Sequence, residues 1–277
     1  MHFTKMQGLG NDYVYVDLTR ERVENPSALA VAVSRPHFGV GADGLVLIGP
    51  SRCADFSMRI FNADGSESEM CGNATRCVGK YVYERGLARR ERITLETLAG
   101  IKTLYLTVED GVVSRVRVDM GAPVLDGKEI PTTLGTGRVL RQPLEVDGRA
   151  FEVTCVSMGN PHAVIFLNED VETFDVGRYG PLIERHAAFP HRTNVEFAQV
   201  KEEGRIRMRV WERGSGVTLA CGTGACATAV AASLCGLAGR RAIVELDGGE
   251  LLVEWEEDTV YKTGPAAFVF DGEWTDP

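Results

Sequence analysis

Cys221 has the clearest chemical potential in this sequence, because it lies on a glycine-rich turn that leads directly into an alanine-rich run. The run to Ala232 predicts a helix that begins at the cysteine. The N–H groups of a helix's first turn carry a positive partial charge, so we expect the thiol to be stabilised as a thiolate base. Gly222 and Gly224 lack a Cβ and would let a carboxylate approach the same amides. A buried structural cysteine is the alternative interpretation.

A second copy of this arrangement lies earlier in the chain, around Cys71. Asn11 lies 60 residues before Cys71, and Asn160 lies 61 residues before Cys221. The chain therefore reads as two copies of one unit, in which a polar turn and a cysteine recur at matched positions. Further pairs at equal distances from their cysteines are Asn62 with Glu212, and Gly44 with Asn194.

Two activated thiols at equivalent positions predict one ligand site in a crevice between two domains, with a thiol on each side. Such a pair can exchange a disulfide, bind a metal ion or exchange protons with a substrate. Metal binding has the weakest support, because Cys77 and Cys226 fall inside the expected helices and zinc-type spacing is missing. Redox chemistry lacks a C-x-x-C motif. Proton exchange uses the symmetry directly, since one thiolate removes a Cα proton and the opposite thiol returns one, inverting a stereocentre.

Composition describes an ordinary globular chain. Its 277 residues, 44% hydrophobic and 25% charged, suggest about two domains. A net charge of −9 and the lack of a basic stripe argue against a nucleic-acid partner. The sequence shows no signal peptide and no long apolar span, so we expect no membrane partner. Seven cysteines without disulfide-framework spacing fit a reducing compartment, and we expect the cytoplasm.

Turn residues and apolar periodicity divide both halves in the same order, with strands first, then the cysteine and its helix, then hairpins. Both halves end at a similar glycine- and proline-containing break. We therefore expect an N-terminal domain of residues 1–120, completed by residues 265–277, and a C-terminal domain of residues 121–264. The strand-like run at 266–270 is expected to return to the sheet of the first domain.

The run Gly39–Gly44 matches the dinucleotide-binding pattern G-x-G-x-x-G letter for letter. That motif needs a preceding strand and a following helix. Here Arg35-Pro36-His37 precedes the glycines and a strand-like run at 45–48 follows, so we expect a loop that enters a strand. Helices are expected at 26–34, from Cys71 to near Gly86, at 177–186 and from Cys221 to about Gly236.

Together these motifs resemble the diaminopimelate epimerase family, and the resemblance runs from Met1 to about Phe270. Single motifs would be unspecific, whereas the set is highly specific. The motifs that carry it are Lys5-Met6-Gln7-Gly8-Leu9-Gly10-Asn11-Asp12, Asn62-Ala63-Asp64-Gly65-Ser66, Cys71-Gly72-Asn73, Gly159-Asn160-Pro161-His162, Thr193-Asn194-Val195-Glu196-Phe197, and Glu212-Arg213-Gly214 with Cys221-Gly222-Thr223-Gly224.

The resemblance implies an isomerase that interconverts LL-diaminopimelate and meso-diaminopimelate for lysine and peptidoglycan synthesis. It implies two-cysteine catalysis without pyridoxal phosphate, metal or other cofactor, a small-molecule substrate as the partner, and a homodimer. The implied fold is α+β, with two pseudo-symmetric domains. Each would be a mixed, largely antiparallel sheet or barrel wrapped around a central helix.

The resemblance also implies roles for particular residues. Cys71 and Cys221 match the family's catalytic pair, and His162 and Glu212 match the groups that accompany the two thiols. An arginine at position 213 could hold the distal carboxylate of the substrate in bidentate fashion. The positions that match substrate contacts are Asn11, Asn62, Gly72, Asn73, Asn160, Asn194, Glu212, Arg213, Gly222 and Thr223.

This chain departs from the family pattern at two places. Many members carry Gln where this chain has Gly44, and Gly-Ala where it has Ala74-Thr75. Neither change removes a proton-transfer group. The nearest rival is a proline racemase or hydroxyproline epimerase, but those enzymes carry His where this chain has Asn73. A second rival is a non-catalytic thiol-redox or ligand-binding protein of the same fold, for which the cysteines would be dispensable.

Overall fold

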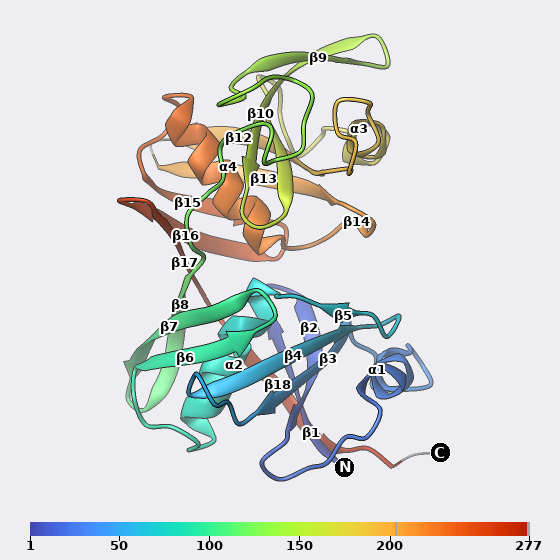
Figure 1. Ribbon diagram of the computed structural model, residues 1–277, viewed down its shortest axis with the longest axis vertical. Helices are drawn as coiled ribbons and strands as arrows, with labels where there is room; N and C mark the ends of the chain where they lie inside the picture. The colour runs from blue at the N-terminus through green and yellow to red at the C-terminus, as the bar shows by residue number, and fades with distance from the viewer. Residues whose placement is uncertain (203, 276–277) are drawn as a thin grey trace. The chain divides into compact units, whose positions relative to one another are not determined.

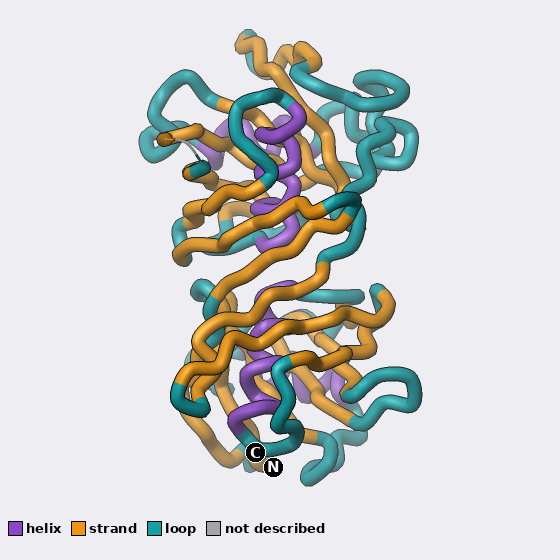
Figure 2. The backbone as a smooth tube through the Cα atoms, turned by 90° about the vertical axis from the view of Figure 1, so that its left-hand side faces the viewer, coloured by secondary structure: helices purple, strands orange, loops and turns teal. Residues whose placement is uncertain are grey.

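The chain folds into two units that are each built around one helix. The computed structural model describes residues 1–202 and 204–275. Unit 1 is Met1–Asp119 with the chain from Thr263 onward, and unit 2 is Met120–Lys262. In each unit, strands surround a single helix, α2 (Gly72–Glu84) or α4 (Gly222–Leu234), as Figures 1 and 2 show. The α+β class predicted from the resemblance is confirmed.

Unit 1 is a mixed sheet whose strands follow the order β18-β1-β2-β3-β4-β6-β7-β8. The returning strand β18 pairs antiparallel with β1, which confirms the expected return of the chain's end to the first sheet. The short strand β5 pairs with β4. The bounds are β1 (His2–Gly8), β2 (Asn11–Asp17), α1 (Pro26–Ser34), β3 (Gly44–Gly49), β4 (Phe56–Asn62), β5 (Glu67–Ser68), β6 (Arg92–Thr97), β7 (Gly100–Glu109), β8 (Val112–Asp119) and β18 (Ala267–Glu273).

Unit 2 is a mixed sheet with the order β9-β10-β11-β12-β13-β15-β16, and the short strand β14 pairs with β13. The bounds are β9 (Gln142–Val146), β10 (Arg149–Ser157), β11 (Pro161–Phe166), α3 (Val176–Glu184), β12 (Asn194–Glu202), β13 (Arg205–Glu212), β14 (Gly216–Val217), β15 (Arg241–Leu246), β16 (Gly249–Glu256) and β17 (Thr259–Gly264).

Both sheets repeat one pairing pattern. From β1 to β7 the successive pairs are antiparallel, parallel, antiparallel, parallel and antiparallel. From β10 to β16 the pairs alternate in the same way. The central helix follows the fourth strand of this series in both units. The sequence repeat is therefore a structural repeat, and it places the two cysteines at equivalent points.

The central helices differ in how they fill their sheets. Helix α4 is made mostly of small residues and is buried nearly all round, so strands pack closely against it. Helix α2 buries charged side chains that make hydrogen bonds: Arg76 donates to Pro265 O at 2.9 Å, and Lys80 donates to Glu84 Oε1 at 2.7 Å and to Val113 O at 2.8 Å. Cys77 and Cys226 are fully buried in these helices, as expected for core thiols.

The Gly39–Gly44 motif follows helix α1 and leads into β3, so the expected loop entering a strand is confirmed. All four expected helices are present, with ends shifted by at most about two residues. Within residues 1–202 and 204–275, no helix combines the length and apolar character needed to cross a bilayer.

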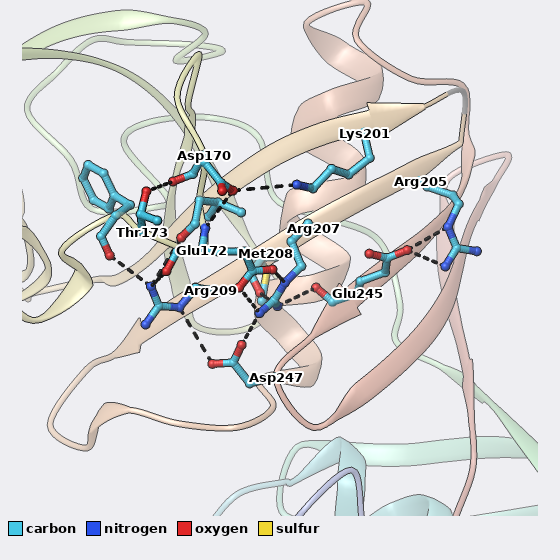
Figure 3. A network of polar contacts seen from close by, with 12 residues as sticks. Asp170, Glu172, Thr173, Lys201, Arg205, Arg207, Met208, Arg209, Glu245 and Asp247 are labelled. Carbon is cyan, nitrogen blue, oxygen red and sulfur yellow. Dashed lines mark hydrogen bonds and ion pairs between the residues drawn. The ribbon is translucent and has the colours of Figure 1, made fainter.

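A polar network ties the outer face of unit 2 together (Figure 3). Arg207 on β13 is largely buried, donates to both carboxylate oxygens of Glu172 at 2.6 and 3.1 Å, and pairs with Asp247. It also reaches two backbone carbonyls, on Met208 and Glu245. Because a buried guanidinium must have its donors satisfied, this set fixes β13 against the neighbouring loop and β15.

Candidate active site

Each candidate thiol caps the N-terminus of the central helix in its unit. The backbone of Cys71 (φ −129°, ψ 116°) and that of Cys221 (φ −108°, ψ 106°) are extended, so the helix begins at the next residue. The carbonyl of each cysteine accepts the first helical hydrogen bond, from Thr75 N at 2.9 Å and from Ala225 N at 3.0 Å. Each thiol therefore lies beside the positive end of a helix dipole.

In unit 1, the Cys71 thiol donates to Asn11 Oδ1 across 3.3 Å. The amide of Asn11 in turn donates to Asp43 Oδ2 at 2.7 Å, and Asp43 also accepts from Asp12 N at 3.1 Å. Burial raises the pKa of the Asp43 carboxyl, against these two hydrogen bonds, which lower it. The nearest side-chain partner of Cys71 in this unit is thus a neutral amide, held by a carboxylate behind it.

Tyr13 is a further neighbour of Cys71 that the sequence reasoning missed. Its side chain is 5% exposed, and its phenol lies close enough to Asn11 and Cys71 for both to influence its pKa. The pKa of Tyr13 is raised far above its ordinary value, first by burial and then by the charge of Cys71. A usable signal was present, since Tyr13 follows Asn11 by the same interval that His162 follows Asn160.

The other predicted residues of unit 1 lie on the surrounding strands and helix start. Asn62, at the end of β4, donates to Ser66 Oγ at 3.0 Å. Gly72 and Asn73 form the buried first turn of α2. At Gly44 a Cβ would lie 2.1 Å from Phe61 O, so a side chain there requires β3 and β4 to move apart. The family's common Gln therefore has no room in this arrangement of the strands.

In unit 2, Glu212 at the end of β13 is the direct partner of Cys221. Its carboxyl accepts from the Thr218 hydroxyl and lies close enough to the Cys221 thiol for each group to shift the pKa of the other. Burial raises the pKa of Glu212, and the nearby Glu196 carboxylate raises it further. A carboxyl group with a raised pKa beside a thiol is suited to accept and return a proton.

His162 on β11 is fully buried, with an oxygen atom against each ring nitrogen. Nδ1 lies 2.7 Å from Glu196 Oε1, and Nε2 lies 3.0 Å from Asn160 Oδ1. Glu196 is equally buried. The sequence predicted His162 and Asn160 as site residues. It included Glu196 only as part of a motif, although the structure places this carboxylate between the histidine and the start of α4.

The expectation of a thiolate at Cys221 is wrong for this structure. The pKa of Cys221 is raised well above its ordinary value, first by burial of a side chain that is 4% exposed, then by the charges of Glu212 and Glu196. The Gly224 N–H, 3.4 Å from Sγ, and the Thr223 hydroxyl, 3.6 Å away, act in the opposite direction. Desolvation and two carboxylates outweigh the helix start, so the surroundings of Cys221 disfavour its thiolate form.

The remaining predicted residues of unit 2 lie around this cluster. Asn194 accepts from Arg213 N at 2.9 Å and donates to Pro161 O at 2.9 Å, which ties β12 to the turn that follows β13. The Arg213 side chain is exposed and donates to His191 O at 3.2 Å. Gly222 forms the first turn of α4 together with Thr223. In the part of the chain that the structure describes, no group of three or more His, Cys, Asp or Glu side chains is arranged to hold a metal ion.

Comparison with known proteins identifies the family to which this chain is similar. The family model described as diaminopimelate epimerase matches residues 3–125 and 154–269. The chain is 56% identical over 275 residues to the diaminopimelate epimerase of Acetivibrio thermocellus, covering 99% of this chain and 98% of that protein. It is 57% identical over 277 residues to the diaminopimelate epimerase of Pelotomaculum thermopropionicum, covering 99% of both.

Solved structures share the fold at low sequence identity. A probable proline racemase from Agrobacterium radiobacter aligns with a TM-score of 0.70 and 16% identity, covering 99% of this chain and 92% of that one. A phenazine biosynthesis protein of the PhzF family from Bacillus anthracis aligns with a TM-score of 0.69 and 17% identity, covering 100% and 99%. At these identities the likeness shows a common fold, and it does not show a common substrate.

Proposed function

Because the chain belongs to the diaminopimelate epimerase family, we propose that it interconverts LL-diaminopimelate and meso-diaminopimelate by two-base proton transfer at Cα, with Cys71 and Cys221 as the two bases. One observation carries this proposal. Each unit presents a single thiol at the N-cap of its central helix, within the same succession of strands. A reaction that inverts one stereocentre needs a proton-transfer group on each face.

The proposed step balances in protons and electrons. One cysteine thiolate takes the Cα proton, so a C–H bond breaks and an S–H bond forms while the electron pair stays on the substrate as a carbanion. The other cysteine, as a thiol, delivers its proton to the opposite face, so an S–H bond breaks and a C–H bond forms. The enzyme ends with its single thiolate on the other side, and a turnover in reverse restores it.

Two ionisable groups near the Cys221 thiol are proposed to assist the proton transfer. Glu212 takes up and returns the proton of Cys221, a role supported by the mutual pKa shifts of the two groups and by the burial of both. His162, in the buried cluster with Glu196, is the second ionisable group that accompanies the thiol chemistry. These two residues, with Cys71 and Cys221, are the proposed catalytic set.

Substrate is held, in this proposal, by the helix starts and by polar side chains around them. The N–H groups of Gly72, Asn73, Gly222 and Thr223 receive the carboxylate at the reacting carbon, where two helix dipoles each supply about half an elementary charge. Arg213, which is exposed, binds the distal carboxylate. The polar side chains proposed to contact the substrate are Asn11, Asn62, Asn160, Asn194 and Glu212.

The same proposal includes a cytoplasmic homodimer that works without metal or other cofactor in lysine biosynthesis. The family resemblance supports the dimer, and seven cysteines without disulfide-framework spacing support a reducing compartment. Light scattering of the purified protein measures the oligomeric state independently of activity.

The deciding experiment incubates the protein with LL-diaminopimelate in deuterated water and follows Cα deuterium by NMR and the isomer ratio by chiral chromatography. We expect meso product carrying deuterium. Cys71→Ala and Cys221→Ala are each expected to lose isomer formation. Cys53→Ala is the matched control, because Cys53 is an exposed thiol outside the site.

Two outcomes contradict the mechanism. One is native protein that puts no deuterium at Cα of diaminopimelate. The other is full epimerisation in both cysteine variants, which would mean that neither thiol moves the proton.

A further inference from the structure

The hydrogen-bond partners of His162 restrict which of its ring nitrogens can carry a proton. A neutral imidazole has one N–H and one lone pair, whereas both ring nitrogens here face a side-chain oxygen or amide. With Glu196 as a carboxylate and the Asn160 oxygen facing Nε2, both nitrogens donate. With Glu196 as a carboxylate and the Asn160 amide reversed, Nε2 accepts from the amide. In both cases Nδ1 carries a proton that it donates to a Glu196 carboxylate.

Glu196 is well placed to impose this state. It lies on β12, paired with Val164, while His162 lies on β11 opposite Asn194, so two neighbouring parallel strands hold the pair. Both side chains have no exposed surface. The Oε2 atom of Glu196 has no hydrogen-bond partner among the described residues, so the bond to His162 is its principal anchor. Burying a carboxylate is costly unless it is paired.

Glu196 also presses against the start of α4. A Cβ on Gly224 would lie 2.6 Å from Glu196 Oε1 and 3.2 Å from Cys221 Sγ, so glycine makes room for the carboxylate. The Gly224 N–H meanwhile donates to the Cys221 thiol. The carboxylate thus lies at the junction of histidine, helix and reactive cysteine.

The structural repeat provides an internal comparison. Val46 occupies the position of Glu196 in unit 1, since it pairs with Tyr15 as Glu196 pairs with Val164. The residue equivalent to Gly224 is Ala74, the third after its cysteine. Where the carboxylate is absent, a side chain fills the helix position. The fold therefore does not require a charge here, and its presence in unit 2 calls for a chemical reason.

We infer that Glu196 is a positioning residue of the Cys221 half-site: it accepts the Nδ1–H of His162, which leaves Nε2 as the nitrogen that exchanges protons, and it places a second carboxylate beside the thiol. This inference rests on the proposed function for its kinetic consequence. Its structural consequence, the proton position on His162, is independent of any substrate. The charged and titratable groups that face Cys221 are Glu196, Glu212 and His162, from β12, β13 and β11.

The test uses the full chain with two substitutions at Glu196, a control substitution at Glu172 and one at Gly224. Glu196→Val copies unit 1, and nitrogen-15 NMR of labelled histidine is expected to show Nδ1 protonated in the native protein and the proton moved to Nε2 in the variant. With diaminopimelate, kcat is expected to fall about ten- to a hundredfold, the range seen when an orienting partner of a functional histidine is removed. KM should stay within about twofold, because Glu196 does not touch substrate.

Glu196→Gln keeps the shape and removes the charge. We expect alkylation of Cys221 by iodoacetamide, mapped by mass spectrometry, to reach its midpoint at a lower pH than in the native protein, because a negative neighbour has gone. Glu172→Gln, which removes an exposed carboxylate from the network of Figure 3, is the control and should change neither readout. Gly224→Ala should lower kcat in the native background and add little to Glu196→Val.

The outcomes separate the two proposals. The positioning role is overturned if Nδ1 of His162 is unprotonated in the native protein. It is also overturned if Glu196→Val changes neither the tautomer of His162 nor kcat. Either result counts even if the enzyme epimerises normally. If the histidine proton follows Glu196 but no diaminopimelate is turned over, the positioning role stands and the proposed function fails.

Discussion

The two half-sites have the same backbone arrangement and differ in the charged side chains around the cysteine. Each has an asparagine turn, a strand end and a cysteine N-cap in the same order. Around Cys71, unit 1 supplies a neutral amide from Asn11 and a phenol from Tyr13. The Asp43 carboxylate contacts the Asn11 amide, which in turn contacts the thiol. Around Cys221, unit 2 supplies the Glu212 carboxyl directly, with a buried histidine and a second carboxylate behind it.

This difference indicates that the two units share their order of strands and helix, whereas the side chains around the two cysteines have separate roles. In the Cys221 half-site, burial and two carboxylates raise the pKa of the thiol and so disfavour the thiolate. A two-base reaction needs one thiol and one thiolate at the start of each turnover. A repeat with identical surroundings would give both cysteines the same tendency, whereas unequal surroundings bias the pair toward one protonated partner.

Glu212→Gln is expected to have the largest effect of the substitutions that test this asymmetry. Glutamine keeps the hydrogen bond but cannot take a proton, so kcat should fall by about a hundredfold to ten-thousandfold, the usual contribution of a general acid or base. Steady-state epimerisation kinetics measure it. Glu172→Gln serves as the matched control in the same unit. A kcat within about threefold of native would show that the Cys221 thiol exchanges its proton without Glu212.

Much of the arrangement of turns, helices and strands was predictable from the sequence. The turns at Asn11 and Asn160, the helix starts at the two cysteines and the return of β18 to the first sheet all follow from glycine, asparagine and cysteine at matched spacings. These are local signals, because turn chemistry and apolar periodicity act over a few neighbouring residues. The repeat then strengthened each local signal by showing it twice.

The charged surroundings of the thiols were harder to foresee. Glu196 lies between Val195 and Phe197, where alternation alone does not say which side of the sheet a residue faces or what lies there. Its importance comes from the register that brings it beside His162. The thiolate expectation at Cys221 failed for a related reason, since a helix start is visible in sequence but the depth of burial is not.

The alkylation profile of the native protein tests the asymmetry without any substitution. Because the pKa of Cys221 lies above its ordinary value of 9.0, fewer than about one in ten of these thiols should be thiolate at pH 8. Labelling of Cys221 should therefore keep rising beyond pH 9, and at pH 8 it should be slower than that of exposed Cys53. Peptide mapping after timed iodoacetamide pulses gives both rates. A Cys221 midpoint below pH 9 would contradict the charge difference.

Tyr13→Phe should have the smallest effect, and it probes the neutral half-site. The substitution removes a phenol hydroxyl near Asn11 and Cys71 but leaves the ring in its buried position. A neutral hydrogen bond contributes about 0.5–1.5 kcal/mol, so kcat should fall by about two- to tenfold. Epimerisation kinetics in both directions measure the loss.

The same substitution at Tyr15 is the control, because Tyr15 is also buried on β2 but its hydroxyl lies against the core thiol Cys77. Tyr15→Phe is expected to leave kcat unchanged, since Cys77 takes no part in the proposed reaction. If Tyr13→Phe instead cost as much as Glu212→Gln, the phenol would be a proton-transfer group. The two half-sites would then be chemically alike, with tyrosine doing in unit 1 what the carboxylate does in unit 2.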